Sequence, residues 1–209
     1  FVREVEPRIR TSERARWSRI LAQENENIRA ALEWGLVDPA GPLTGQQIII
    51  AMGYSWIIGG SFSEGRHFGQ RYAAQMQEDT PDAIRAGLLT FSASLSLIWD
   101  RNASALSALK QALELARQVG DPELLATCLV EVGLGAMLTR DFATATARFQ
   151  ECIDLGRETG DEWRPVLASI WMGIVATMQG EEERASEIMR QALTLARRQG
   201  DPWCLMILL

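Results

Sequence analysis

Apolar residues recur at helical spacing along most of the chain, in successive segments that short polar turns separate. Such a period of three to four residues is typical of amphipathic helices. It predicts helices at about 44–58, 62–78, 82–99, 103–119, 122–139, 142–159, 162–179 and 182–199. The turns inside the resulting pairs are Gly59-Gly60-Ser61, Asp100-Arg101-Asn102, Thr139-Arg140-Asp141 and Gln179-Gly180-Glu181.

A Gly-Asp pair recurs between the helix pairs at a constant interval. Gly120, Gly160 and Gly200 lie 40 residues apart, and each is followed by an Asp. Glycine can adopt the left-handed conformation that ends a helix, and aspartate can cap the next one. The period predicts repeats at 41–80, 81–120, 121–160 and 161–200, with a further repeat starting at 201.

The repeats share columns of small and large residues. Gly53, Ala93, Gly133 and Gly173 occupy one column, and a second contains Leu109, Phe149 and Met189. Small residues in mid-helix let two backbones approach closely, and large ones fill the remaining space. One hairpin cannot bury its own apolar face, so neighbouring hairpins must stack. The fold expected is therefore all-α, a solenoid of antiparallel helical hairpins over residues 41–209.

Residues 1–40 do not repeat and are expected to form a linker and a leading helix. Residues 1–11 carry mixed charges and a proline, which indicates a frayed lead-in. Thr11 or Ser12 can cap one long helix that continues to about Leu36. The prolines in the segment 38–42 end this helix. We expect it to act as an adaptor or cap on the array.

Composition excludes several classes of function. A net charge of −6 argues against a nucleic-acid-binding surface, which needs clustered Lys and Arg. No apolar run reaches the length of a membrane span, and no signal peptide is recognisable. Three cysteines without metal-ligand spacing indicate buried thiols in a reducing, cytoplasmic environment. The chain begins with Phe1 and stops at Leu209 within an apolar run, so we interpret it as part of a longer protein.

No catalytic, cofactor-binding or metal-binding constellation is recognisable. His67 is the only histidine, and no GK[ST] phosphate loop is present. Glu181-Glu182-Glu183 is explained by the preference of helix N-termini for acids. We therefore expect no enzyme activity, no cofactor and no metal.

The tryptophans are open to two interpretations, ligand stacking and packing. Trp163 and Trp203 share a repeat column, and Trp17 and Trp34 lie on the leading helix, so packing is favoured for these four. Trp56 and Trp99 fit either interpretation.

The order Gly133, Ala136, Ala145, Phe149, Cys152 resembles the small–large pattern of tetratricopeptide repeats. That resemblance implies a right-handed superhelix. The usual period is about 34 residues, so the helices here are expected to be longer. Gly69 and Tyr72 depart from the pattern, where a large and a small residue are expected.

The resemblance can be narrowed. The segment 24–34, together with the Leu-Ala-Arg ending before Gly-Asp, is similar to the repeat region of large bacterial signal-transduction ATPases and of LuxR- or SARP-type transcriptional regulators. This likeness implies an upstream nucleotide-binding module and an effector, often a DNA-binding activator. The chain itself would be the sensor arm.

In such arrays the first helix of each pair lines the concave side. The binding face implied here consists of Gln47, Ile50, Tyr54, Ile57, Thr90, Ser94, Leu97, Thr127, Val130, Leu134, Met137, Leu167, Ile170, Ile174 and Met178. An exposed face so apolar marks an interaction site. The alternative is that some of these residues belong to the core or are covered by further repeats.

Two functions follow from this reading. The first is a non-catalytic interaction and sensing module whose concave groove binds a partner protein, a peptide or a small apolar ligand. The partner could include upstream domains of the same chain. The alternative is a constitutive scaffold or self-association module, such as a homodimer, with no ligand.

Overall fold

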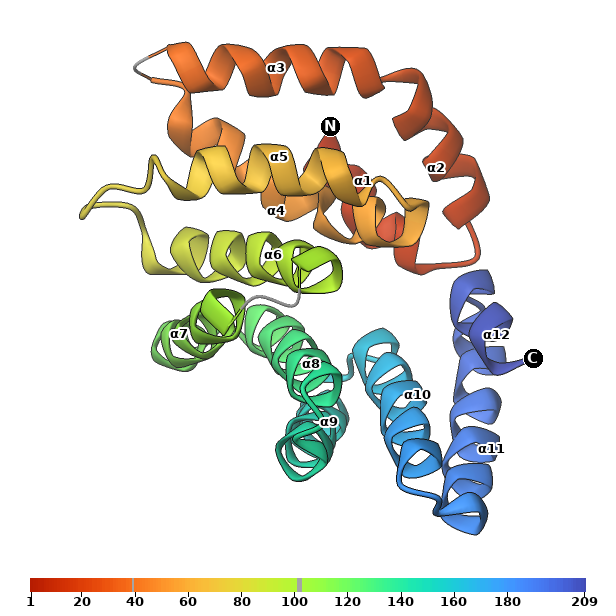
Figure 1. The fold of residues 1–209 in the computed structure, drawn as a ribbon. Coiled ribbons are helices and arrows are strands. Elements are labelled where there is room, and N and C mark those ends of the chain that lie inside the picture. Colours follow the sequence, from red (N-terminus) through yellow and green to blue (C-terminus); the bar gives the residue numbers. More distant parts are fainter. Residues whose placement is uncertain (39, 101–102) are drawn as a thin grey trace. The chain divides into compact units, whose positions relative to one another are not determined.

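The computed structural model describes residues 1–38, 40–100 and 103–209, and every regular element in this part of the chain is a helix (Figure 1). The predicted all-α architecture of paired helices is confirmed. The chain divides into two compact units, residues 1–115 and 116–209. The boundary falls inside a helix rather than between repeats, and the division into 40-residue blocks stays a prediction.

The first unit consists of N-terminal helical segments followed by two helix pairs. In chain order these are α1 (Val2–Val5), the 3-10 helix η1 (Glu6–Arg10), α2 (Arg14–Gln23), α3 (Asn25–Val37), α4 (Pro42–Gly59), α5 (Phe62–Ala73), α6 (Asp82–Asp100) and most of α7 (Ala103–Val119). α4 packs against α3, α5 and α6, which places it at the centre of this unit.

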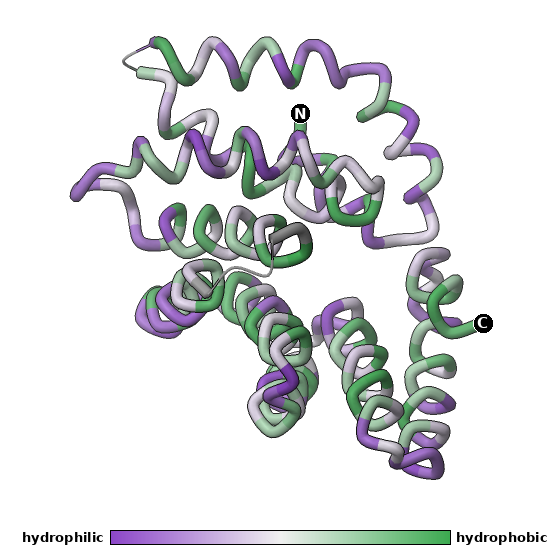
Figure 2. The backbone as a smooth tube through the Cα atoms, viewed as in Figure 1, coloured by the Kyte–Doolittle hydropathy of each residue, from purple (hydrophilic) through white to green (hydrophobic). Residues whose placement is uncertain are grey.

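The second unit contains two complete hairpins. After the end of α7 come α8 (Pro122–Leu138), α9 (Phe142–Thr159), α10 (Trp163–Met178), α11 (Glu182–Gln199) and α12 (Pro202–Leu208). α10 packs between α9 and α11 and also contacts α8 and α12. Accordingly α10 is buried along most of its length, whereas α11 buries only three alanines. Figure 2 shows hydrophilic and hydrophobic positions in turn along α11, as expected for an outer amphipathic helix.

The Gly-Asp junctions stop and start helices as predicted. Gly120, Gly160 and Gly200 have φ of 72°, 78° and 83°. Oδ1 of Asp121 accepts hydrogen bonds from the backbone N–H groups of Glu123 and Leu124, at 2.9 and 3.2 Å. At the next junction, Oδ1 of Asp161 accepts hydrogen bonds from the backbone N–H groups of Trp163 and Arg164. At the last one, Oδ1 of Asp201 accepts a hydrogen bond from the backbone N–H of Trp203.

The small–large columns pack as the repeat pattern predicts. A Cβ atom on Gly133 would lie 2.5 Å from the ring of Phe149, and one on Gly173 would lie 2.9 Å from Met189. Phe149 is fully buried. The glycine of each first helix thus makes room for the large residue of the second helix, and the close approach fixes the geometry of the hairpin.

Two side chains join the hairpins of the second unit. Arg164, which is 4% exposed, donates from Nε to Thr127 Oγ1 (2.9 Å), from Nη1 to Asp161 Oδ2 (2.9 Å) and from Nη2 to Glu123 Oε1 (2.5 Å). It therefore ties α10 to α8. The indole N–H of Trp163 donates to Asp201 Oδ2 at 2.7 Å, which ties α10 to the cap of α12.

The N-terminal residues differ from the expected frayed lead-in. They form α1 and η1, with Val5 only 1% and Ile9 only 2% exposed, and both helices pack on α4. The hydrophobic effect explains the difference, because two isolated apolar residues suffice to hold a short helix on an apolar partner. The mixed charges at the other positions of residues 1–11 hide this packing in the sequence pattern.

The leading helix is divided into α2 and α3 at Glu24, where φ is −89° and ψ is 2°. Between Leu21 and Ile28, the flanking buried apolar residues, the chain is polar apart from Ala22. Asn27 Nδ2 donates to the Glu24 carboxylate at 2.7 Å, so a local side-chain bond supports the new start. Pro39, one of the residues expected to end this helix, lies outside the described residues.

α5 ends earlier than predicted, at Ala73 rather than near residue 78. The carbonyl groups after it are held by Arg85, whose Nη2 donates to Gln77 O at 2.8 Å and to Glu78 O at 3.1 Å. This junction lacks the Gly-Asp pair of the later ones. Here the guanidinium group of Arg85 binds the carbonyl oxygens that follow the helix. At the later junctions a glycine in the left-handed conformation ends the helix instead.

Tyr72, which departs from the repeat pattern, is accommodated by glycines on neighbouring helices. Its ring is fully buried, and a Cβ on Gly45 would lie 2.0 Å from it. A Cβ on Gly35 would lie 2.4 Å from its hydroxyl oxygen. The hydroxyl donates to Leu32 O at 2.7 Å. The large residue thus anchors α3 and α5 around α4 instead of disturbing the hairpin.

A candidate interaction groove

The predicted concave face is largely part of the packed interior. Of its fifteen residues, nine are buried, namely Tyr54, Thr90, Ser94, Leu97, Thr127, Val130, Met137, Leu167 and Ile170. Five are half-buried, namely Gln47, Ile50, Ile57, Leu134 and Ile174, and Met178 is 47% exposed. The accessible remainder comprises three residues of α4 in the first unit, and Leu134, Ile174 and Met178 in the second.

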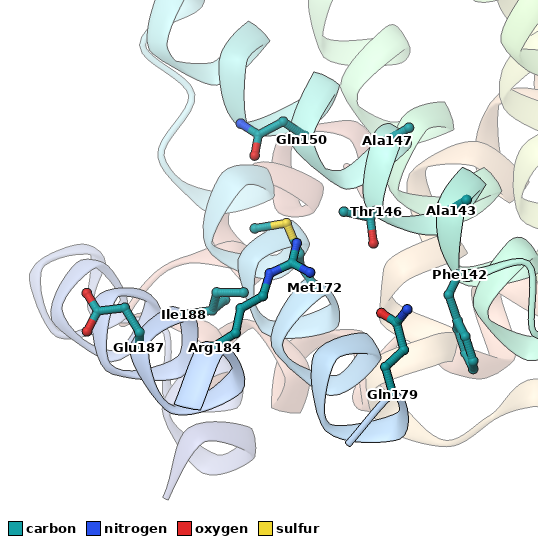
Figure 3. A pocket seen from close by; sticks show the side chains of 10 residues that line it. All are labelled: Phe142, Ala143, Thr146, Ala147, Gln150, Met172, Gln179, Arg184, Glu187 and Ile188. Atoms are coloured by element: carbon teal, nitrogen blue, oxygen red, sulfur yellow. The ribbon is translucent and has the colours of Figure 1, made fainter. Parts of the chain in front are cut away.

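A hollow of about 770 Å³ lies elsewhere in the second unit, between α9 and α11 with α10 as its floor (Figure 3). We call it the α9–α11 groove. Its lining consists of Phe142, Ala143, Thr146, Ala147, Gln150, Met172, Gln179, Arg184, Glu187 and Ile188. Ala143 and Ala147 of α9 contribute small side chains to this lining.

The groove combines an apolar floor with a polar rim. Phe142, Met172 and Ile188 are half-buried and supply the apolar surface. Arg184 Nη1 donates to Glu181 at 2.6 Å on one part of the rim. On the other part, Glu187 accepts hydrogen bonds from Arg190 and Gln191, which lower its pKa, the bond from Arg190 being the larger cause. The rim therefore presents both a cation and an anion.

None of the fifteen predicted residues lines this groove. The resemblance directed attention to the first helices of the hairpins, whereas most of the lining comes from the second helices α9 and α11. One signal was present in the sequence. Phe142, Thr146 and Gln150 recur every four residues, which places them on one face of a helix.

The residues that the sequence analysis considered for catalysis or metal binding lie outside the groove. His67 is exposed, with its Nε2 3.2 Å from Arg71 Nη1. Glu181 pairs with Arg184 at the start of α11, and all three cysteines are buried thiols that form no disulfide bond. Among the described residues, no group of His, Cys, Asp or Glu is arranged to hold a metal ion.

The tryptophans differ in their surroundings. Trp34, which was expected to pack, is 53% exposed. Trp163 is buried at a hairpin junction, in accord with the expected packing. Trp56 is buried beside a cavity of the first unit. The side chain of Trp99 and the turn residues Arg101 and Asn102 lie outside the described residues.

In the part of the chain that the structure describes, no helix is both long and apolar enough to cross a membrane.

Solved structures with the same fold include a Rap protein, a phosphatase and a signal-transduction ATPase. A Rap protein complexed with competence and sporulation factor matches 92% of this chain with a TM-score of 0.71 and 14% identity. Aspartyl phosphate phosphatase F from Bacillus subtilis matches 79% with a TM-score of 0.64 and 15% identity. A signal transduction ATPase with numerous domains and a tetratricopeptide repeat sensor, from Pyrococcus horikoshii, matches 87% with a TM-score of 0.61 and 13% identity.

These likenesses confirm the tetratricopeptide-like fold. The chain spans 56%, 44% and 31% of those three proteins, respectively. A comparison with curated proteins gave no match. The family model described as anaphase-promoting complex subunit 5 matches residues 68–139, 134–177 and 166–209, in three overlapping segments. Together these segments cover more than half of the sequence, and the chain therefore belongs to the anaphase-promoting complex subunit 5 family of helical repeats.

Proposed function

We propose that the chain is a non-catalytic interaction and sensing module of a larger bacterial signal-transduction ATPase or transcriptional regulator. The observation that carries the proposal is the α9–α11 groove, which is open, apolar at its floor and charged at its rim. The fold is one that the Rap protein with its bound factor and the sensor of the Pyrococcus horikoshii ATPase share. Both neighbours support a regulatory role.

The partner proposed is an amphipathic helical segment of another protein or of another domain. An amphipathic helix lays its apolar face into a groove between two helices and places its charges on the rim. Phe142, Met172 and Ile188 would contact the apolar face. Arg184 and Glu187 would set the direction of the helix, because they offer opposite charges.

The groove is tested with a displayed library of amphipathic helical peptides selected against the chain. Ala147 is exposed and small, so Ala147→Arg fills the groove without disturbing the core. We expect this change to weaken the selected peptides by at least about ten-fold. Glu158→Arg, which places the same side chain on an exposed position of α9 outside the groove, should leave the affinity unchanged.

The predicted concave face supplies the competing site. Leu134→Lys combined with Ile174→Lys changes two of its accessible residues. If only this double variant loses the peptides, the α9–α11 groove is the wrong site and the concave face is the right one. A library that yields no peptide sensitive to either set of changes would contradict the interaction function.

Self-association without a ligand is the second candidate. Met206 and Leu209 favour it, because they are 67% and 86% exposed apolar residues in or beside α12. Sedimentation equilibrium distinguishes the candidates. A stable dimer that Met206→Lys converts to monomers, with no peptide binding, would support the scaffold.

A further inference from the structure

The charges that line the α9–α11 groove lie on only one of its two edges. Among the described residues of the lining, Arg184 and Glu187 are the charged ones, and both belong to α11 (Figure 3). The lining residues of α9 are all uncharged, namely Phe142, Ala143, Thr146, Ala147 and Gln150. A segment that lies in the groove therefore meets charge along α11 and neutral groups along α9.

The α11 edge contains more acids than bases. Residues 181–190 include four glutamates and two arginines. Glu183 and Glu187 are spaced by four residues, so they lie on the same face of α11, one turn from each other. Both line a second, open hollow on α11, and this hollow shares Glu187 with the groove. The two acids thus follow the edge of the groove, and we call them the acidic row.

The two arginines of this segment do not balance its acids. Each arginine is already paired, Arg184 with Glu181 at 2.6 Å and Arg190 with Glu187. Glu183 is exposed, and within the described structure its carboxylate forms no hydrogen bond and no ion pair. A helix N-terminus favours acids in its first turn, which explains their position, but it supplies no counter-ion for them. Negative charge is therefore left over beside the groove.

This charge distribution discriminates between helices that could lie in the groove. The apolar stripe of such a helix contacts Phe142, Met172 and Ile188, and burial of the stripe supplies the affinity. Lysines or arginines spaced by four residues along one flank face the acidic row, which has the same spacing. Glutamates on that flank meet like charge instead. Exposed ion pairs are individually weak, so the charges decide which helix binds and how it is rotated.

We infer that the α9–α11 groove binds a basic amphipathic helix of a partner protein, with the cationic flank of that helix along α11 and its uncharged polar flank along α9. The inference rests on the proposed function, because it names the partner of the same groove. The one-sided charge fixes the rotation of the bound helix about its axis. It also makes recognition depend on salt, since the acidic row is exposed to solvent.

Synthetic helical peptides test the charge of the partner. They share one stripe of leucine and alanine, and their flank carries lysine, glutamine or glutamate at every fourth position. By fluorescence anisotropy at about 0.1 M NaCl, the lysine peptide should bind the chain at least about ten-fold more tightly than the glutamate peptide. At about 1 M NaCl, where the Debye length is about 3 Å, this preference should fall below about three-fold. A lysine peptide with a scrambled stripe should not bind, which excludes general attraction to an acidic chain.

Variants of the chain locate the bound peptide. Ala147→Trp fills the groove without adding charge and should weaken all three peptides by at least about ten-fold. Glu183→Lys should reduce the preference for lysine over glutamate by at least about three-fold. Glu158→Lys makes the same change in net charge and should leave the preference unaltered. Glu158 lies about 12 Å further along α9 than Gln150, the last lining residue of that helix, which exceeds the Debye length of about 10 Å at 0.1 M salt.

The outcomes separate this inference from the proposed function. If Glu183→Lys loses helicity by circular dichroism, Glu187→Gln decides, because it lies beyond the first turn of α11 and should also reduce the preference. An unchanged preference in the folded variants would refute the acidic row as its source. Peptides that bind equally whatever their flank, and that Ala147→Trp weakens, would overturn the basic partner and leave the groove in place. Peptides that Ala147→Trp does not weaken would remove the groove itself, and the inference with it.

Discussion

Arg140 adopts the left-handed conformation, with φ of 62°, at a turn where Gly180 occupies the equivalent position with φ of 77°. A side chain in this region crowds the following carbonyl oxygen, and glycine does not. Arg140→Gly should therefore raise the free energy of unfolding by about 0.5–1 kcal/mol, as measured by urea denaturation. Gly180→Arg should lower it by a similar amount. A destabilised Arg140→Gly variant would contradict the strain argument.

Tyr72 makes the stability of the first unit sensitive to alkaline pH. Burial raises the pKa of its hydroxyl from 10.0 to about 12. The folded state holds this proton more tightly than the unfolded state, so the contribution to stability is complete below pH 10 and is lost as pH rises from about 10 to about 12. Tyr72→Phe should abolish that part of the loss in urea titrations across this range. Cys152 in the second unit, whose pKa burial also raises to about 12, retains its own loss, which starts near pH 9.

At the scale of elements, α8 and α10 are joined by an ion pair between Glu123 and Arg164. The two residues should contribute unequally to stability. Arg164 is buried and makes three side-chain contacts, whereas the Glu123 side chain is 61% exposed. Arg164→Met should lower the free energy of unfolding by about 2–4 kcal/mol, because it removes several hydrogen bonds from a buried position. Glu123→Gln should cost less than about 1 kcal/mol, since Thr127 and Asp161 still hold the guanidinium. Equal losses in guanidinium denaturation would show that the ion pair with Glu123 dominates.

The elements also show what can be predicted from the sequence. Helix periodicity and the Gly-Asp junctions are local signals, so the bounds of α8 to α11 are predicted within one residue. The pairing of Gly133 with Phe149 follows from repeat columns, which are nearly local. The burial of Val5 and Ile9 depends on how α1 and η1 pack on α4, and helical periodicity does not report this packing.

The burial of the predicted concave face could be predicted least from the sequence. Residues such as Val130 and Ile170 recur in the first helices with apolar character, but a column of apolar residues looks the same whether it faces a groove or a neighbouring helix. The structure places both in the interior. The α9–α11 groove arises from small residues on one helix opposite larger ones on another, 40 residues away. To predict this groove, one must know the distance between α9 and α11, and the sequence of neither helix alone gives that distance.

At the scale of the whole molecule, stability should be divided between residues 1–115 and 116–209. Repeat arrays are stabilised mainly by contacts between neighbours. Gly45→Ala would place a Cβ 2.0 Å from the Tyr72 ring, and we expect it to destabilise the first unit by more than about 2 kcal/mol. Hydrogen exchange should then accelerate throughout residues 1–115 but keep wild-type rates in α9 to α11. Arg164→Met should give the opposite pattern, and uniform acceleration in either variant would indicate one cooperative unit.

The double role of Asp201 has a consequence for how such a chain lengthens. One carboxylate caps its own helix and accepts the indole N–H of Trp163 from the preceding hairpin. Both halves of this joint recur in the sequence at the 40-residue period, since Trp203 follows Asp201 as Trp163 follows Asp161. A tandem duplication of any 40-residue segment that contains both Asp161 and Trp163 would therefore keep the same Trp-to-Asp spacing at the new seam. Gene rearrangement alone could add hairpins here, without any compensating substitution at the seam.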